Sequence, residues 1–280
     1  MDYTSLNNNM IDGQVRPING INEEIIDAFS SVDRANFVPQ SHLLNAYIEK
    51  NLHLTQNRYL LRSNLIAEII NHVLPRNNET ILVLPSSTGY SSAVISKLSE
   101  TVISIEEDEN LIAIAENGIR KSGIDNVVFL KKKITENCLE QGPFNAIIIE
   151  GAIDYLPNQF LEQLEENGRL FAMINDNEVT NAKLFKKANK TIKSKFLFSC
   201  DIPKLNFFSQ KSSFSFWYKR VIAYIIYMNN KPSNTEDILD AIRNMMGGND
   251  PSKEESLPND ILELTNPIAE ENGVEDTSIL

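Results

Sequence analysis

The sequence predicts an α/β fold with a mostly parallel sheet. Two observations support this: several short runs are apolar throughout, and segments with helical spacing of apolar residues alternate with them. Strands that are apolar on both faces are typical of parallel sheets covered by helices on both sides. The predicted strands are Thr80–Leu84, Thr101–Ile105, Asn126–Leu130, Phe144–Glu150 and Arg169–Ile174. The predicted helices among them are Ser91–Leu98, Asn110–Lys121 and Asn158–Glu166.

The segments on either side of this block extend the prediction. Apolar residues at helical spacing predict helices over Glu23–Phe29 and Asn64–Val73, and a further helix over Asn181–Lys187. Two late runs, Phe196–Cys200 and Phe214–Trp217, lie close together in the sequence. We expect them to pair as an antiparallel edge of the sheet.

The composition changes after Met228. Between residues 229 and 280, 12 acidic and 3 basic residues give −9 of the total net charge of −12. So few apolar residues cannot offset the entropy of ordering. We therefore expect residues 1–218 to form one domain. Residues 219–280 are expected to hold a linker, one amphipathic helix over Thr235–Met246 and a disordered acidic tail.

Composition also excludes several classes of function. Phosphate contacts need clustered basic residues, and the one basic run, Lys131–Lys133, is most simply a solvated loop, so no nucleic-acid partner is expected. The longest apolar stretch, Val221–Met228, is far shorter than the ~20 residues that span a bilayer. Cys138 and Cys200 lack metal-ligand spacing. The sequence predicts a soluble cytoplasmic protein without a metal site or a membrane partner.

One turn and one acid form the candidate binding site. Ligands of open parallel sheets bind at the carboxyl ends of the strands. There the sequence places a polar turn after the first strand and an acid at the end of the second, which could accept hydrogen bonds from both hydroxyls of a ribose. The same turn would also serve as an ordinary helix cap, and acids at strand ends are common. The candidate residues are Ser86, Ser87, Thr88, Gly89, Tyr90 and Glu106.

Several segments, in order, resemble the protein-L-isoaspartate O-methyltransferases over about residues 11–217. They are Val32–Pro39 with Ala46-Tyr47, Ile81–Val94, Thr101–Glu106, Pro143–Gly151 and Leu161–Phe171. The resemblance implies a Rossmann-like methyltransferase fold with S-adenosyl-L-methionine (SAM) as cofactor. It implies that Ser87–Tyr90 hold the methionine end and Glu106 the ribose. The implied substrate is a damaged protein or peptide, methylated on the carboxylate of an isoaspartyl residue.

The chain departs from the family's pattern at several polar positions. Val83 stands where the family has its loop acid, and Pro85 and Ser87 replace two loop glycines. Lys133 replaces the acid that would hold the adenine, and Leu61 replaces a substrate-side serine. The sequence therefore assigns no catalytic residue. An alternative stays open, in which a catalytically degenerate methyltransferase fold acts as a binding or scaffold module.

The acidic tail has a resemblance of its own. Ser233–Met246 and Asp260–Glu270 resemble the N-terminal part of the alphaproteobacterial polar-organising protein PopZ family. One interpretation is that the amphipathic helix over residues 235–246 docks on a protein partner. The other interpretation is an incidental acidic extension.

Overall fold

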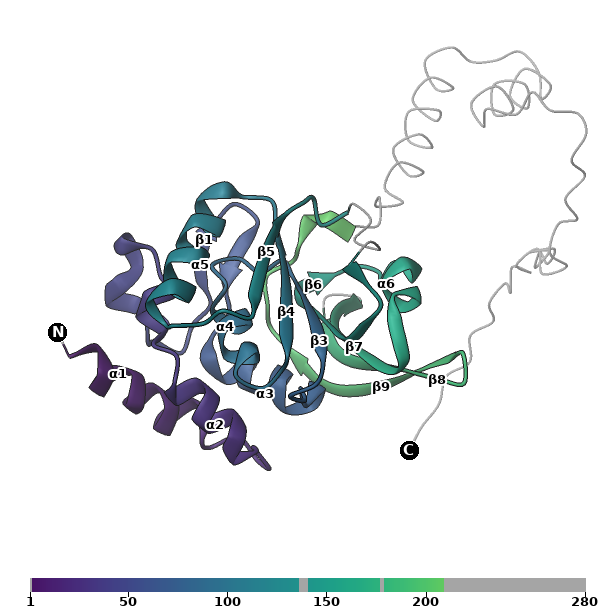
Figure 1. Ribbon diagram of the computed structural model, residues 1–280, viewed down its shortest axis with the longest axis horizontal. Coiled ribbons are helices and arrows are strands. Elements are labelled where there is room, and N and C mark those ends of the chain that lie inside the picture. The colour runs from purple at the N-terminus through teal and green to yellow at the C-terminus, as the bar shows by residue number, and fades with distance from the viewer. Residues whose placement is uncertain (1, 136–140, 177–178, 209–280) are drawn as a thin grey trace, which may run out of the picture. The chain divides into compact units, whose positions relative to one another are not determined.

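The central feature of the molecule is a seven-stranded sheet with the strand order β5-β4-β3-β6-β7-β8-β9 (Figure 1). The computed structural model describes residues 2–135, 141–176 and 179–208, all within the unit Met1–Ser212. Strands β3 to β7 run parallel, whereas β8 is antiparallel to both β7 and β9. The predicted mostly parallel sheet with an antiparallel edge is thus confirmed. The strands are β3 (Thr80–Leu84), β4 (Thr101–Glu106), β5 (Val127–Lys131), β6 (Phe144–Ile153), β7 (Leu164–Asp176), β8 (Val179–Ala188) and β9 (Thr191–Cys200).

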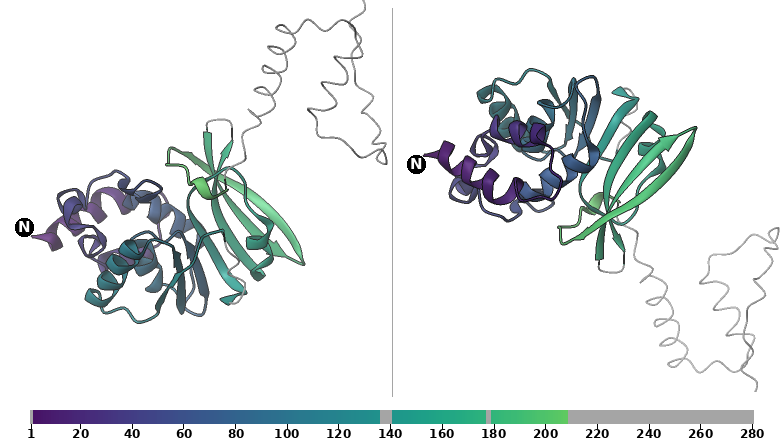
Figure 2. Two further views of the ribbon diagram at one scale, coloured as in Figure 1. Left: turned by 90° about the horizontal axis from the view of Figure 1, so that it is seen from above. Right: turned by 90° about the horizontal axis from the view of Figure 1, so that it is seen from below.

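The two faces of the sheet are buried in two separate hydrophobic clusters. In β3, Ile81 and Val83 belong to one cluster, and Leu82 and Leu84 belong to the other. Because both faces are covered, successive residues are apolar, which explains the runs in the sequence. Figure 2 shows the helices of the N-terminal segment, in purple and blue, on one side of the sheet. The helices that follow the N-terminal segment are α3 (Ser63–Val73), α4 (Tyr90–Ser96), α5 (Glu109–Lys121) and α6 (Asn158–Glu162).

Short helices and one hairpin make up the N-terminal segment. They are α1 (Tyr3–Met10), the π-helical turn η1 (Ile11–Val15), α2 (Glu23–Ser30), the 3₁₀ turns η2 (Arg34–Phe37) and η3 (Gln40–Asn45), and strands β1 (Leu52–Thr55) and β2 (Arg58–Leu60). Helices α2 and α3 confirm two predictions. The antiparallel β1–β2 hairpin was not predicted.

Two polar residues, Asp33 and Arg34, connect the parts of this segment through hydrogen bonds. The Tyr47 hydroxyl donates to the Asp33 carboxylate at 2.6 Å. The Arg34 side chain is fully buried and donates to the carbonyls of Ala46 and Leu61, both at 2.7 Å. A buried guanidinium needs such acceptors to offset its desolvation. The motif that begins at Val32 therefore has a structural role, which is to join η2 to the hairpin region.

Two predictions about helices need correction. The helix predicted over Asn181–Lys187 is wrong, because these residues lie in strand β8. Thr180, Ala182 and Leu184 are buried in alternation, so pairing with both neighbours overrides the helical preference of alanine, leucine and lysine. The helix predicted over Asn158–Glu166 ends at Glu162, since β7 begins two residues later.

The antiparallel edge also differs from the prediction in its pairing. The strand predicted at Phe196–Cys200 is confirmed, but within the described residues its only neighbour is β8. A register shift in β8 between Ala182 and Lys183 interrupts this pairing. The segments Phe214–Trp217 and Thr235–Met246, like the whole acidic tail, lie outside the described residues. No described helix is long and apolar enough to cross a bilayer.

Candidate functional site

The candidate site centres on the carboxylate of Glu106, the last residue of β4, which is 0% exposed. Its Oε1 accepts hydrogen bonds from the backbone N–H groups of Glu107 at 2.9 Å and Asp108 at 3.2 Å. Its Oε2 accepts from the N–H of Ser87 at 3.0 Å. Strands β4 and β6 lie on opposite sides of β3, so the strand order reverses there. Ligands of such sheets bind at this point, beyond the carboxyl ends of the strands, where the Glu106 carboxylate lies.

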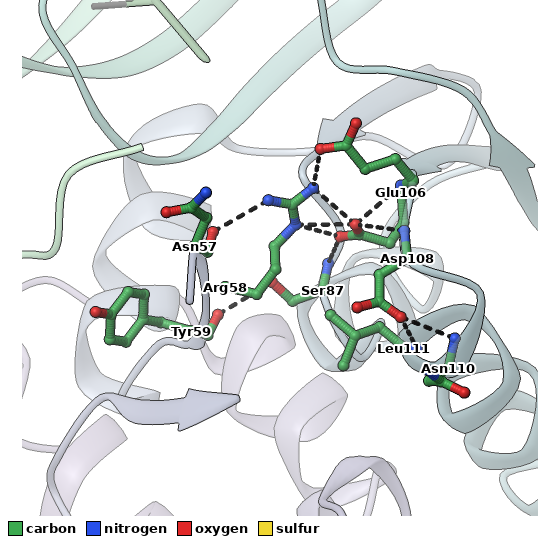
Figure 3. Close-up of polar contacts among 9 residues, drawn as sticks. Asn57, Arg58, Tyr59, Ser87, Glu106, Asp108, Asn110 and Leu111 are labelled. Carbon is green, nitrogen blue, oxygen red and sulfur yellow. Dashed lines mark hydrogen bonds and ion pairs between the residues drawn. The ribbon is translucent and has the colours of Figure 1, made fainter. Parts of the chain in front are cut away.

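Arg58, the first residue of β2, makes a buried ion pair with this carboxylate (Figure 3). Its Nε lies 2.8 and 2.9 Å from the two carboxylate oxygens of Glu106, and its Nη2 lies 2.8 Å from Oε1. Nη2 also reaches the Glu107 carboxylate at 2.9 Å. The guanidinium lies 4.6 Å from the centre of the Phe207 ring. Burial lowers the pKa of Arg58, but the two carboxylates outweigh it and raise the pKa overall.

The turn between β3 and α4 brings only some of its predicted residues to Glu106. Ser87 adopts a left-handed φ of 49°, and its hydroxyl donates to the Tyr59 carbonyl at 3.1 Å. The hydroxyls of Ser86 and Thr88 are buried and have no hydrogen-bond partner among the described residues. Buried hydroxyls without a protein partner are uncommon in folded proteins, and solvent does not reach either oxygen.

Tyr90 and Gly89 have other surroundings. The Tyr90 ring is fully buried, 6.1 Å from the ring of Phe29 and 4.8 Å from the Arg34 guanidinium. Its side chain therefore belongs to the core rather than to the ligand side of the turn. Gly89 has a φ of 79°, and an added Cβ would lie 2.8 Å from the Phe129 ring, so only glycine fits there.

Glu150 is a second carboxyl near the carboxyl ends of the central strands, and it is not among the residues predicted from the sequence. It lies in β6, one residue beyond the pair Leu84 and Ile149. Burial raises the pKa of Glu150 to about 7, although a hydrogen bond with Ser91 and the charge of Arg34 lower it. Both protonation states are therefore populated near neutral pH.

The pKa of Glu150 predicts how stability depends on pH. The folded chain holds this proton more tightly than the unfolded chain, so stability should fall as pH rises from about 4.5 to about 7. Glu150→Gln removes this loss. We expect the variant to be more stable than the parent by ~1–3 kcal/mol at pH 8, and about equal to it at pH 4. Urea unfolding at both pH values checks this. The exposed Glu116→Gln is the control and should show no such difference.

Other candidates from the sequence do not form sites. No group of His, Cys, Asp and Glu side chains in the described residues could hold a metal ion. Burial raises the pKa of the Cys200 thiol to about 11, so it is not a nucleophile at neutral pH. Cys138 lies outside the described residues. Lys131 pairs with Glu109 in the neighbouring helix.

Comparison with known proteins identifies the family. The family model of protein-L-isoaspartate(D-aspartate) O-methyltransferase matches residues 6–202. The chain belongs to this family. The isoaspartate O-methyltransferase of Roseiflexus castenholzii is 27% identical over 203 residues, which cover 72% of this chain and 91% of that one. That of Methanospirillum hungatei is 29% identical over 158 residues, 56% of this chain and 73% of the relative.

Solved structures of isoaspartate O-methyltransferases share the fold. A putative enzyme from Plasmodium falciparum, in complex with S-adenosyl-L-homocysteine, superposes with a TM-score of 0.62 at 21% identity. The match covers 73% of this chain and 98% of that one. A second isoaspartate O-methyltransferase gives a TM-score of 0.63 at 23% identity, covering 71% and 65% of the two chains. The Rossmann-like methyltransferase fold implied by the sequence is thus confirmed.

Proposed function

We propose that this chain is a SAM-dependent methyltransferase that acts on the isoaspartyl carboxylate of damaged proteins. Membership of the isoaspartate O-methyltransferase family supports the reaction and its substrate. The observation that carries the proposal for this chain is the hydrogen bond from the Ser87 N–H to Glu106. It joins the turn after β3 to the acid that ends β4, and this arrangement suits a nucleoside ligand.

The proposed roles of the residues follow from their chemistry. Glu106 would accept the ribose hydroxyls, and the hydroxyls of Ser86 and Thr88 would face the methionine end. When bound, SAM would supply an electrophilic methyl group for an oxygen of the substrate carboxylate. No proton moves, so the chain needs to orient the two reactants and exclude water rather than supply a general base.

Two features of the site favour a second candidate function, that of a binding module. The acceptor positions of Glu106 are taken up within the chain by Arg58 and three N–H groups. Val83 is fully buried where the family has its loop acid. These features are those of a degenerate methyltransferase fold that binds a protein partner without the cofactor.

We also propose a cytoplasmic location, on the basis of the composition.

Two measurements on the full chain test the proposed function. Calorimetric titration with SAM and S-adenosyl-L-homocysteine should show one site. Methyl transfer to an L-isoaspartyl peptide should exceed transfer to the same peptide with ordinary aspartate. A folded protein that binds neither ligand would favour the binding module instead.

A further inference from the structure

The Glu106 carboxylate has no acceptor capacity left for a ribose. A carboxylate offers about four lone-pair directions. Oε1 receives two backbone N–H groups and the Arg58 guanidinium, and Oε2 receives the Ser87 N–H and Arg58 Nε. A ribose diol brings two hydroxyl donors, each of which needs an acceptor. Binding therefore requires some existing donors to leave.

Arg58 is the donor that can leave without rearranging the main chain. The three N–H groups belong to the backbone of the two turns that form the site, at Ser87 and at Glu107–Asp108. Arg58 is a side chain on the short β1–β2 hairpin, and Nη2 already lies 2.9 Å from the Glu107 carboxylate. The Glu107 side chain is 35% exposed. Arg58 can thus release Glu106 and keep one ion pair nearer to solvent.

We propose that Arg58 gates the ribose-binding carboxylate: paired with Glu106 it closes the site, and its release admits the nucleoside. The inference rests on the proposed function, since it takes SAM as the ligand. In this view Phe207, stacked on the guanidinium, holds the closed position, and Arg58 determines how tightly the cofactor binds.

The gate has a measurable effect on affinity. When only a fraction of molecules is open, the apparent dissociation constant rises by the inverse of that fraction. A buried, bidentate ion pair favours the closed state strongly. Arg58→Gln keeps a polar side chain of similar reach but removes the charge. The variant should bind S-adenosyl-L-homocysteine about tenfold or more tightly than the parent.

The experiment is calorimetric titration of S-adenosyl-L-homocysteine into four full-length proteins: the parent, Arg58→Gln, Phe207→Ala and Arg169→Gln. Phe207→Ala removes the stacked ring and leaves both charges, so a tightening of about threefold is expected. Arg169→Gln is the matched control, because Arg169 also makes a buried bidentate ion pair, with Glu79. Glu79 directly precedes β3, so this pair lies at the amino ends of the strands, away from Glu106. The affinity of the folded Arg169→Gln variant should equal that of the parent.

The outcomes separate the two proposals. If the parent binds the ligand and a folded Arg58→Gln binds it no more tightly, the gate is wrong and the proposed function stands. If Arg58→Gln does not fold, Phe207→Ala decides, and unchanged affinity contradicts the gate. If no folded protein binds the ligand, the proposed function fails together with the gate.

Discussion

Glu106→Ala is expected to destabilise the protein by about 3–5 kcal/mol, because it leaves the buried Arg58 guanidinium with only the partly exposed Glu107 carboxylate as an ion-pair partner. The substitution also removes the acceptor of three backbone N–H groups, at Ser87, Glu107 and Asp108. These bonds hold the two turns of the site together. Urea unfolding of the full chain, followed by circular dichroism, measures the loss.

A double-mutant cycle identifies the buried charge as the cause. The cycle compares Arg58→Met, Glu106→Leu and the double variant. The double variant removes both charges and should cost less than Glu106→Leu alone. Equal or additive losses would mean that the ion pair contributes little and that Glu106 acts through the turns only.

Arg169→Met should cause a loss of similar size, about 3–5 kcal/mol, far from the ligand site. Arg169 donates to both oxygens of Glu79 at 2.8 and 2.7 Å, and these side chains are 10% and 8% exposed. It also donates to the carbonyls of Val73 and Leu74, where α3 ends. Carbonyls at a helix C-terminus have no partner within the helix, so one side chain stabilises both the helix end and the sheet. Urea unfolding gives the measurement.

The exposed pair Arg16 and Asp12 provides the comparison. Their side chains are 52% and 65% exposed, and Arg16→Met should change stability by less than about 1 kcal/mol. If the two arginine variants lost the same stability, burial would not be the reason for the large effect at Arg169.

Much of the sheet could be predicted from the sequence because both of its faces are buried. The runs at Thr80–Leu84 and Thr101–Ile105 are apolar at nearly every position, and this pattern has one common structural explanation. Strand β8 was misread because one face is less covered and its lysines and alanine favour a helix. The β1–β2 hairpin was missed because Gln56-Asn57 lacks the glycine of the commonest two-residue turns.

The site could be predicted in part. Glu106 was found because its position depends only on its own strand. Arg58 lies 48 residues away in sequence, and its pairing depends on how the hairpin packs against the sheet. The available signal was an arginine directly before the apolar residues Tyr59-Leu60-Leu61, where a solvated charge is not expected. Glu150 was missed for a similar reason, since its high pKa comes from burial, which depends on how other elements pack around it.

Strand β9 is the last strand of the sheet within the described residues, and this position bears on self-association. An edge strand presents backbone donors and acceptors that another chain can pair with, and β9 exposes Ile192 and Phe196, at 38% and 56%. Lys193 and Lys195 lie on the same strand and are exposed. Two β9 strands meeting edge to edge would bring these positive charges together, and the irregular β8–β9 register twists the strand away from a flat template. Like charges and an irregular register would thus both oppose the pairing of β9 with a second copy of the chain.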